Sequence, residues 1–249
     1  MKHKTLISQN ISAPLTALLD LILPPVCLNC HTPLTKQHQL CAKCWQEIDF
    51  ISAPFCEVTG HPLPIASPEN TLSAQAITNP PLYDKARAVA HYQGTMRNLV
   101  HKLKYQDSHD LVPLFASWLH HHGKDLLHTA DPIIPIPLHT TRLWQRKFNQ
   151  AALLAKRLAQ ITNKNAAFNL LLRPKKTCSQ VGLSASERKS NLKGAFAINS
   201  EHPHLLRDQN ILLIDDVLTT GATAGAATQI LKQHQVKEVN LLCLAMVYD

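Results

Sequence analysis

The chain has 249 residues and a formal net charge of +8, and 45% of its residues are hydrophobic while 5% are aromatic. This length supports one or two domains with a sizeable core, and no stretch of eighteen apolar residues occurs, which excludes a membrane-spanning helix. The basic balance favours anionic partners, whereas the low aromatic content disfavours a stacking platform for single-stranded nucleic acid.

The N-terminal stretch has a basic start and is otherwise mostly apolar, but Asp20 interrupts the apolar run. The run meets Pro24 and Pro25, which end a helix, and leads directly into a pair of cysteines. We therefore expect an amphipathic helix over residues 13–23 rather than a signal peptide.

Two close cysteine pairs follow in the spacing C-x2-C-x10-C-x2-C, formed by Cys27, Cys30, Cys41 and Cys44. Four thiolates satisfy a closed, tetrahedral structural zinc site, which keeps no open position for zinc chemistry. Disulfide pairing is the alternative, but clustered pairs among seven cysteines favour metal binding in a reducing compartment. The other thiols are expected to be free, namely those of Cys56, Cys178 and Cys243.

Residues 1–80 are expected to hold the N-terminal helix, the zinc module and a Pro-rich linker, and residues 81–249 a second domain. In that domain strands are expected at residues 88–91, 133–136, 211–214 and 239–247. Helices are expected at residues 97–104, 110–121, 149–161 and 223–233. The alternation predicts an α/β fold with a parallel sheet flanked by helices on both faces. We recognise no internal repeat, and expect packing roles for Trp45, Trp118 and Trp144.

A basic segment follows the apolar strand at residues 133–136, whose two prolines, Pro135 and Pro137, indicate a strand end or edge. The guanidinium groups of Arg142 and Arg146 are suited to pyrophosphate, because they can bind it bidentately. A solvated basic helix face is the alternative interpretation. Asn149 is the expected cap of the helix that comes next.

A second basic stretch covers residues 172–196 and includes Arg188. Its proline, glycine and serine residues indicate a mobile connection, with a short helix at residues 184–191. Such a loop can close over a phosphorylated ligand and exclude water. A surface insertion with a charged helix is the alternative.

Residues 211–223, ILLIDDVLTTGAT, are the most informative stretch. A short buried strand at residues 211–214 ends in Asp215 and Asp216, which can accept hydrogen bonds from vicinal hydroxyls or help to hold Mg²⁺. The following hydroxyls and Gly221 lead into a helix N-terminus, which stabilises an anion. A capped helix with a charged turn is the alternative. A nucleoside-triphosphate P-loop is disfavoured because its lysine and spacing are missing.

This stretch resembles the motif for 5-phosphoribosyl 1-pyrophosphate (PRPP) in type I phosphoribosyltransferases. The resemblance implies that Asp215 and Asp216 face the ribose hydroxyls and that PRPP binds together with Mg²⁺. It also assigns the 5-phosphate to the loop residues Thr219, Thr220, Gly221, Ala222 and Thr223.

An ordered set of strings across the chain resembles the ComF/GntX family of bacterial competence and DNA-utilisation proteins. They include residues 135–139, Arg142, Arg146, residues 148–151, Gln180, Leu183, Arg188, Asn191 and residues 195–196. The family usually has Gly before Phe where this chain has Lys147. Relatives also often carry a further C-x2-C where this chain has Cys56 and Thr59, so we expect one zinc rather than two.

The resemblance implies a cytoplasmic accessory protein that acts in natural transformation or in the use of external DNA. Single-stranded DNA and other competence proteins are the partners it suggests. The alternative is an active phosphoribosyltransferase, a glycosyltransferase that uses Mg²⁺, in which Arg142, Arg146 or Arg188 stabilises the leaving pyrophosphate. No acceptor pocket or catalytic residue is assigned from the sequence.

Overall fold

The structure is a computed structural model that describes residues 24–64, 68, 71–175, 192–201 and 203–247. Its helices are α2 (Ala42–Gln46), α3 (Ala74–Thr78), α4 (Gly94–Tyr105), α5 (Leu111–His122), α6 (Lys124–Thr129), α7 (Thr140–Arg146), α8 (Gln150–Thr162), η1 (Pro203–Leu206) and α10 (Ala222–Lys232). Its strands are β1 (Lys85–His91), β2 (Ile133–Pro135), β3 (Leu171–Leu172), β4 (Ala197–Ile198), β5 (Asn210–Leu218) and β6 (Glu238–Met246). The helices expected at residues 13–23 and 184–191, together with Arg188 and Cys178, lie outside the described residues.

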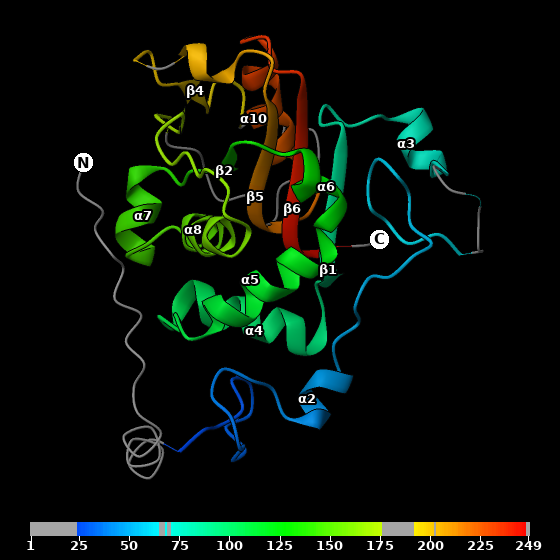
Figure 1. Cartoon of the computed structure of the whole chain (residues 1–249), viewed down its shortest axis with the longest axis vertical. Coiled ribbons are helices and arrows are strands. Elements are labelled where there is room, and N and C mark those ends of the chain that lie inside the picture. Colours follow the sequence, from blue (N-terminus) through cyan, green and yellow to red (C-terminus); the bar gives the residue numbers. More distant parts are fainter. Residues whose placement is uncertain (1–23, 65–67, 69–70, 176–191, 202, 248–249) are drawn as a thin grey trace.

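The central sheet has the strand order β1-β6-β5-β2, and its neighbouring strands pair in parallel. β2 lies at the edge, which agrees with its two prolines and with Pro135 as its last residue. β3 and β4 form a separate antiparallel pair. The parallel sheet predicted from the alternation of strands and helices is confirmed (Figure 1).

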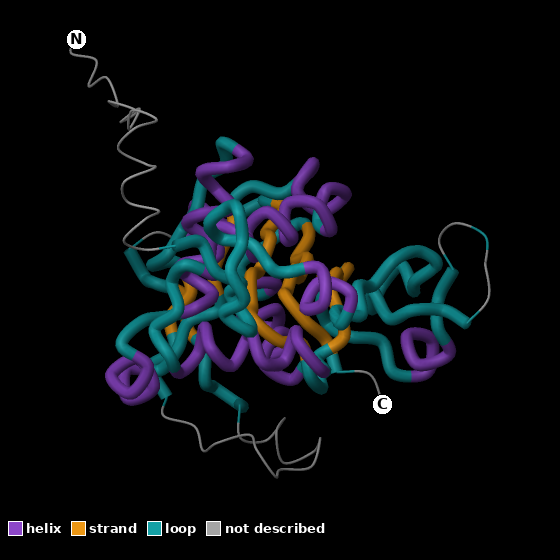
Figure 2. The backbone as a smooth tube through the Cα atoms, turned by 90° about the horizontal axis from the view of Figure 1, so that it is seen from below, coloured by secondary structure: helices purple, strands orange, loops and turns teal. Residues whose placement is uncertain are grey.

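Helices cover both faces of this sheet, as Figure 2 shows from below. On β5, Leu212 and Ile214 belong to a core that includes residues of α4, α5 and α8. Ile211 and Leu213 belong to a second core, which includes residues of α10 and the segment around Phe196. Alternate residues of β5 therefore face two different cores. A parallel sheet that is covered by helices on both faces requires such nearly continuous apolar strands.

Two boundaries near the predicted site differ from expectation. β5 does not end before Asp215 but continues to Leu218, because Val217 and Leu218 extend its pairing with β6. The two carboxylates interrupted the apolar run without interrupting the strand. In addition, α7 forms between β2 and α8, where a helix was expected only under the alternative of a solvated basic helix face, and none of its residues is buried.

The N-terminal module packs on the helices below the sheet (Figure 1). The ring of Trp45 lies 5.0 Å from that of Phe50 and 5.7 Å from that of Trp118. The N–H of Ile51 donates to the carbonyl of Val89, so this segment also covers the outer edge of β1. The domain boundary at residue 80 stays a prediction.

The expected packing role fits Trp118, which is buried, and is wrong for Trp144, which is 87% exposed on α7. Cys56 and Cys243 are free, as expected, and both are buried. Among the described residues, no helix is both long enough and apolar enough to cross a membrane.

Candidate functional site

The four predicted zinc ligands come together at one point in the N-terminal module. The sulfur atoms of Cys27, Cys30, Cys41 and Cys44 all lie within 4.8 Å of one another. Tetrahedral zinc with Zn–S bonds of about 2.3 Å places its sulfur ligands about 3.8 Å apart, so the cluster has nearly the size that zinc requires. The first cysteine pair lies in a turn and the second at the start of α2, whose N-cap is Cys41.

The surroundings of these thiols also fit a metal. The backbone N–H of Cys41 donates to the sulfur of Cys27 at 3.3 Å, and the Asn29 amide donates to that of Cys44 at 3.3 Å. Hydrogen bonds from Thr32 lower the pKa of the Cys30 thiol to about 6, while burial raises the pKa of Cys44 to about 12. Four adjacent thiolates need a divalent cation to balance their charge, and the donor set suits structural zinc.

The second cluster lies at the carboxyl ends of the sheet strands, where the loop after β5 enters α10. Gly221 is the N-cap of α10 and has φ +72°, a conformation that favours glycine. Thr219 and Thr220 are exposed, and Gly221, as the N-cap, has no side chain with which to cap the first turn of the helix. The loop therefore presents hydroxyls and the N-terminal amides of a helix to an incoming anion.

The acid pair lies at the end of β5 beside this loop. Asp216 forms an ion pair with Lys104 of α4, with 2.8 Å between Oδ1 and Nζ, and both side chains are 13% exposed. Asp215 accepts a 2.8 Å hydrogen bond from the N–H of Asp216. Burial, followed by the Asp216 carboxylate, raises the pKa of Asp215 to about 7. The pair therefore carries less negative charge near neutral pH than two exposed aspartates would.

Cations from separate elements surround the acid pair. Arg173, just after β3, is 7% exposed, and its guanidinium lies 5.2 Å from the ring centre of Phe196. Burial and then Arg142 lower the pKa of Arg173 to about 10, while Asp215 opposes this shift. Burial and then Arg146 lower the pKa of Arg142 as well. Positive groups held this close together favour a multiply charged anion between them.

The other predicted arginines are placed differently. Arg146 donates to the hydroxyl of Tyr105 and to Gln150, each at 3.3 Å, and lies over the Tyr105 ring. It belongs to the same basic segment as Arg142 but is held by these partners. Arg188 lies outside the described residues.

Lys104 and Arg173 are residues of the candidate site that the sequence did not assign to it, although Lys104 lies in a string that resembles the family and Arg173 lies in the second basic stretch. Lys104 lies near the end of α4 and Arg173 follows a two-residue strand, so neither belongs to a local motif with the acid pair. In a sequence, a basic residue beside an otherwise apolar segment is a weak signal of a binding site. Here the tertiary packing brings both residues to the acid pair.

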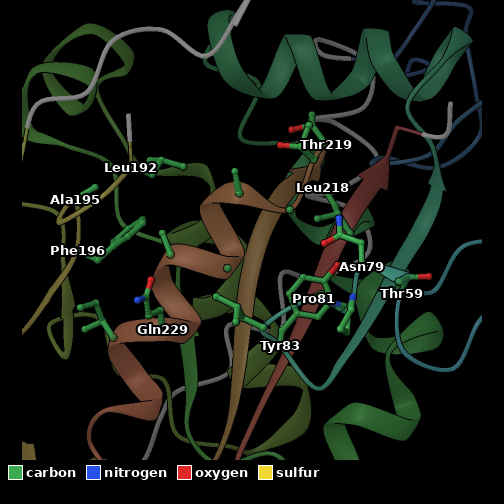
Figure 3. Close-up of a pocket in the computed structure, with 18 of the residues that line it drawn as sticks. Thr59, Asn79, Pro81, Tyr83, Leu192, Ala195, Phe196, Leu218, Thr219 and Gln229 are labelled. Atoms are coloured by element: carbon green, nitrogen blue, oxygen red, sulfur yellow. The ribbon is translucent and has the colours of Figure 1, made fainter. Parts of the chain in front are cut away.

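A cavity of about 680 Å³ lies beside the loop after β5. Figure 3 shows α10 between two walls, with Tyr83 and Pro81 on one side and Leu192 and Phe196 on the other. Hydrogen-bonding side chains of the lining are those of Thr59, His61, Gln75, Asn79, Tyr83, Lys193, Thr219, Thr220 and Gln229. Among the described residues, no carboxylate lines the cavity. Its dimensions are sufficient for a second small molecule next to an anion in the loop.

Comparison with family models divides the chain in the same way as the geometry. The double zinc ribbon domain matches residues 18–77, and the phosphoribosyl transferase domain matches residues 149–247. The first range contains the four thiols, and the second contains β5, the acid pair and the loop before α10.

Similar proteins cover nearly the whole chain. DNA utilization protein YhgH of Escherichia coli K12 is 29% identical over 230 residues, covering 90% of this chain and 98% of that protein. A purine phosphoribosyltransferase structure from Pyrococcus horikoshii aligns with a TM-score of 0.32 and 19% identity, covering 57% of this chain and 73% of that one. Competence protein F of Haemophilus influenzae is 30% identical over 228 residues, covering 88% of this chain and 96% of that protein. This chain belongs to the competence protein F family, with a zinc ribbon module and a phosphoribosyltransferase domain.

Proposed function

We propose that the chain binds PRPP or a related ribose 5-phosphate ligand, together with Mg²⁺, where β5 leads into α10. The observation that carries the proposal is a glycine-capped helix N-terminus beside the acid pair, with Lys104 and Arg173 next to these carboxylates and Arg142 next to Arg173. The loop is suited to the 5-phosphate and the arginines to the pyrophosphate. Asp215 and Asp216 are suited to the ribose hydroxyls and Mg²⁺, with Lys104 leaving Asp216 as the ligand enters.

A thermal-shift comparison of ligands tests this proposal. A ligand that binds the folded state raises the melting temperature according to its concentration and affinity. We expect the largest shift with PRPP and Mg²⁺, a smaller shift with ribose 5-phosphate, and none with ribose. Equal melting temperatures with PRPP and with ribose, each at millimolar concentration, would exclude the proposed ligand class.

We further propose that this binding serves DNA handling in the cytoplasm, in natural transformation or in the use of external DNA. The names of the relatives, competence protein F and DNA utilization protein, support this role. A second support is the indole of Trp144 on α7, which is 87% exposed. An exposed aromatic ring is suited to stacking on an unpaired base.

Anisotropy of a labelled single-stranded oligonucleotide measures this contact. The affinity should fall as salt increases, since neutralising phosphates releases counterions. Trp144→Ala should weaken binding by about tenfold, because one base–aromatic stack contributes about 1–3 kcal/mol, and Trp144→Phe should stay close to the wild type. A response independent of salt, or equal affinities for Trp144→Ala and Trp144→Phe, would count against DNA binding at α7.

The cavity beside the loop favours a second candidate function, an active phosphoribosyltransferase. A bound acceptor there would lie next to the ligand in the loop, which is the arrangement that displacement of pyrophosphate requires. Incubation with PRPP, Mg²⁺ and a panel of nitrogen bases, followed by assay of released pyrophosphate, distinguishes the two roles. Release that depends on one base would establish turnover, while binding of PRPP without release would leave the binding role alone.

A further inference from the structure

Residues 54–63 repeat the local structure of residues 25–34, although we recognised no repeat from the sequence. The two strings are PVCLNCHTPL and PFCEVTGHPL, which share the pattern P-x-C-x4-[TH]-P-L. Antiparallel bridges join Val26 to Pro33 in the first and Phe55 to Pro62 in the second. The repeat therefore has the same turn in both copies.

The hydrogen bonds of the two turns correspond one to one. The N–H of Cys27 donates to Thr32 at 2.8 Å, and that of Cys56 donates to His61 at 2.7 Å. The seventh residue of each string has a positive φ that closes the turn, at +61° for His31 and at +71° for Gly60. Because only part of the sequence pattern is retained, the backbone shows the repeat more clearly than the side chains.

The second halves correspond as well. Cys41 is the N-cap of α2, and its side chain accepts from Cys44, while Ser73 is the N-cap of α3 and accepts from Ala76. The N–H of Cys41 donates to the sulfur of Cys27 at 3.3 Å, as the N–H of Ser73 donates to that of Cys56 at 3.2 Å. The positions of the four zinc ligands are thus taken in the second copy by Cys56, Thr59, Ser73 and Ala76.

These four residues do not fit a zinc ion. Ala76 offers no ligand atom, and the hydroxyls of Thr59 and Ser73 are not among the side chains that bind zinc in structural sites. The Cys56 sulfur instead accepts hydrogen bonds from the backbone at Ser73 and, at 3.5 Å, at Thr59. We infer that the second ribbon, formed by residues 54–64 and 71–78, folds without a metal, although the chain matches a double zinc ribbon domain.

Ion pairs and close packing against β1 take over the role of the metal. Arg87, which is 4% exposed, lies 2.9 Å from the Glu57 carboxylate, and Lys85 lies 2.7 Å from it. The N–H of Ala86 donates to Val58 at 2.8 Å. A Cβ atom on Gly60 would come within 2.4 Å of the Ala86 oxygen, so only glycine allows the second ribbon to pack this closely on the backbone of β1. The second ribbon is therefore held by the edge of the sheet.

This attachment gives the second ribbon a different task from the first. Thr59, His61 and Gln75 form part of the wall of the cavity beside the loop after β5. The first ribbon instead lies against α4, where Lys102 donates to the carbonyl of Leu28 at 3.0 Å. We infer that the metal-free ribbon shapes the ligand cavity and that the zinc ribbon stabilises the helices under the sheet.

The zinc content of the purified chain tests the inference independently of the proposed function. We expect one zinc per chain in the wild type, the same value in Cys56→Ser, and loss of zinc in Cys27→Ser. Two zinc ions in the wild type, or loss of zinc in Cys56→Ser, would overturn the inference.

A gain-of-site variant makes the test sharper. Thr59→Cys, Ser73→Cys and Ala76→Cys together restore four thiols at the equivalent positions, and this variant should bind two zinc ions per chain. Adding Cys56→Ser to it should weaken the second ion's affinity at least tenfold without affecting the first. A folded triple variant, judged by circular dichroism, that still binds one zinc would refute the positional equivalence. If the triple variant does not fold, the zinc contents of the wild type and of Cys56→Ser still test whether the second ribbon binds a metal.

Discussion

The first zinc ribbon and the carboxyl edge of the sheet are both clusters of ionisable groups that are completed by a partner of opposite charge. In the ribbon, four sulfur atoms lie within 4.8 Å and suit a small cation. At the sheet edge, Lys104 and Arg173 lie next to the acid pair, Arg142 lies next to Arg173, and these cations suit an oligophosphate. The ribbon takes its ligands from one short stretch of chain, whereas the edge takes its cations from elements far apart in sequence. A local cluster therefore depends on its ion to fold, while a tertiary cluster is formed by the fold before its ligand arrives.

The largest effect expected from this comparison is the loss of zinc in Cys44→Ser. One missing thiolate opens the site, and structural zinc contributes on the order of 10 kcal/mol in small zinc modules. Zinc content should fall from about one per chain to near zero, and Trp45 should become more exposed, since its packing on Phe50 depends on α2. Elemental analysis and tryptophan fluorescence measure both changes. Cys243→Ala, in β6, is the control and should retain zinc.

Asp215 makes the stability of the sheet edge depend on pH. Its pKa is raised to about 7 in the folded chain, against about 4 when unfolded, so the folded state binds the proton more tightly. The free energy of unfolding therefore falls as the pH rises from about 4 to about 7 and is then level with respect to this group. Asp215→Asn removes this contribution, which is on the order of a few kcal/mol.

Urea denaturation at pH 5, 6, 7 and 8 measures the difference. The stability of Asp215→Asn relative to the wild type should rise over this range. Asp208→Asn is the control, because its carboxylate is 83% exposed, and it should follow the wild-type curve. Parallel curves for Asp215→Asn and the wild type would show that the Asp215 carboxyl titrates normally.

Arg173→Gln tests whether a cation brought in by tertiary packing contributes to ligand binding. Because one charge-assisted contact to the ligand is lost, PRPP affinity should fall about tenfold, which is about 1.4 kcal/mol. Arg157→Gln, an exposed substitution on α8, provides a matched loss of charge. Calorimetric titration should separate the two variants, and equal affinities would exclude Arg173 from the site.

The smallest effect concerns Lys147, which follows α7 with φ +63°. Lys147→Gly relieves a left-handed conformation, which costs about 1 kcal/mol for a non-glycine residue, and loses the exposed ion pair with Asp107, which contributes less. The variant should be more stable by a few tenths of a kcal/mol. Lys147→Ala keeps the strain and loses the ion pair, so it should melt below the wild type. The opposite order of the two melting temperatures would contradict this explanation.

The sequence predicted those parts of the molecule whose structure depends on residues close together in the chain. The four-cysteine cluster, the parallel sheet and the cap at Asn149 follow from spacing, periodicity and a capping side chain, and the structure contains all three. The motif at residues 211–223 does form the turn from β5 into α10. Its strand is longer than predicted, because pairing with β6 continues past Asp216.

The remaining features depend on contacts that no local pattern contains. Lys104 and Arg173 become part of the site because α4 and β3 bring them to the acid pair. Trp144 is exposed because α7 has no buried face, although its residue type favoured packing. The resemblance indicated a lost cysteine pair at Cys56 and Thr59, but the structural repeat was not recognised, because Thr59, Ser73 and Ala76 stand where the first ribbon has cysteines. In each case the backbone arrangement gives the residue its role.

The central claim is that the end of β5 and the loop before α10 bind a ribose phosphate. Calorimetric titration of PRPP with Mg²⁺ into the wild type and into Asp215→Asn/Asp216→Asn tests it most directly. We predict at least tenfold weaker binding in the double variant, about 1.4 kcal/mol or more, with its zinc content unchanged. Equal affinities in the two proteins, with Asp208→Asn also unchanged, would contradict the assignment of the acid pair to the ligand.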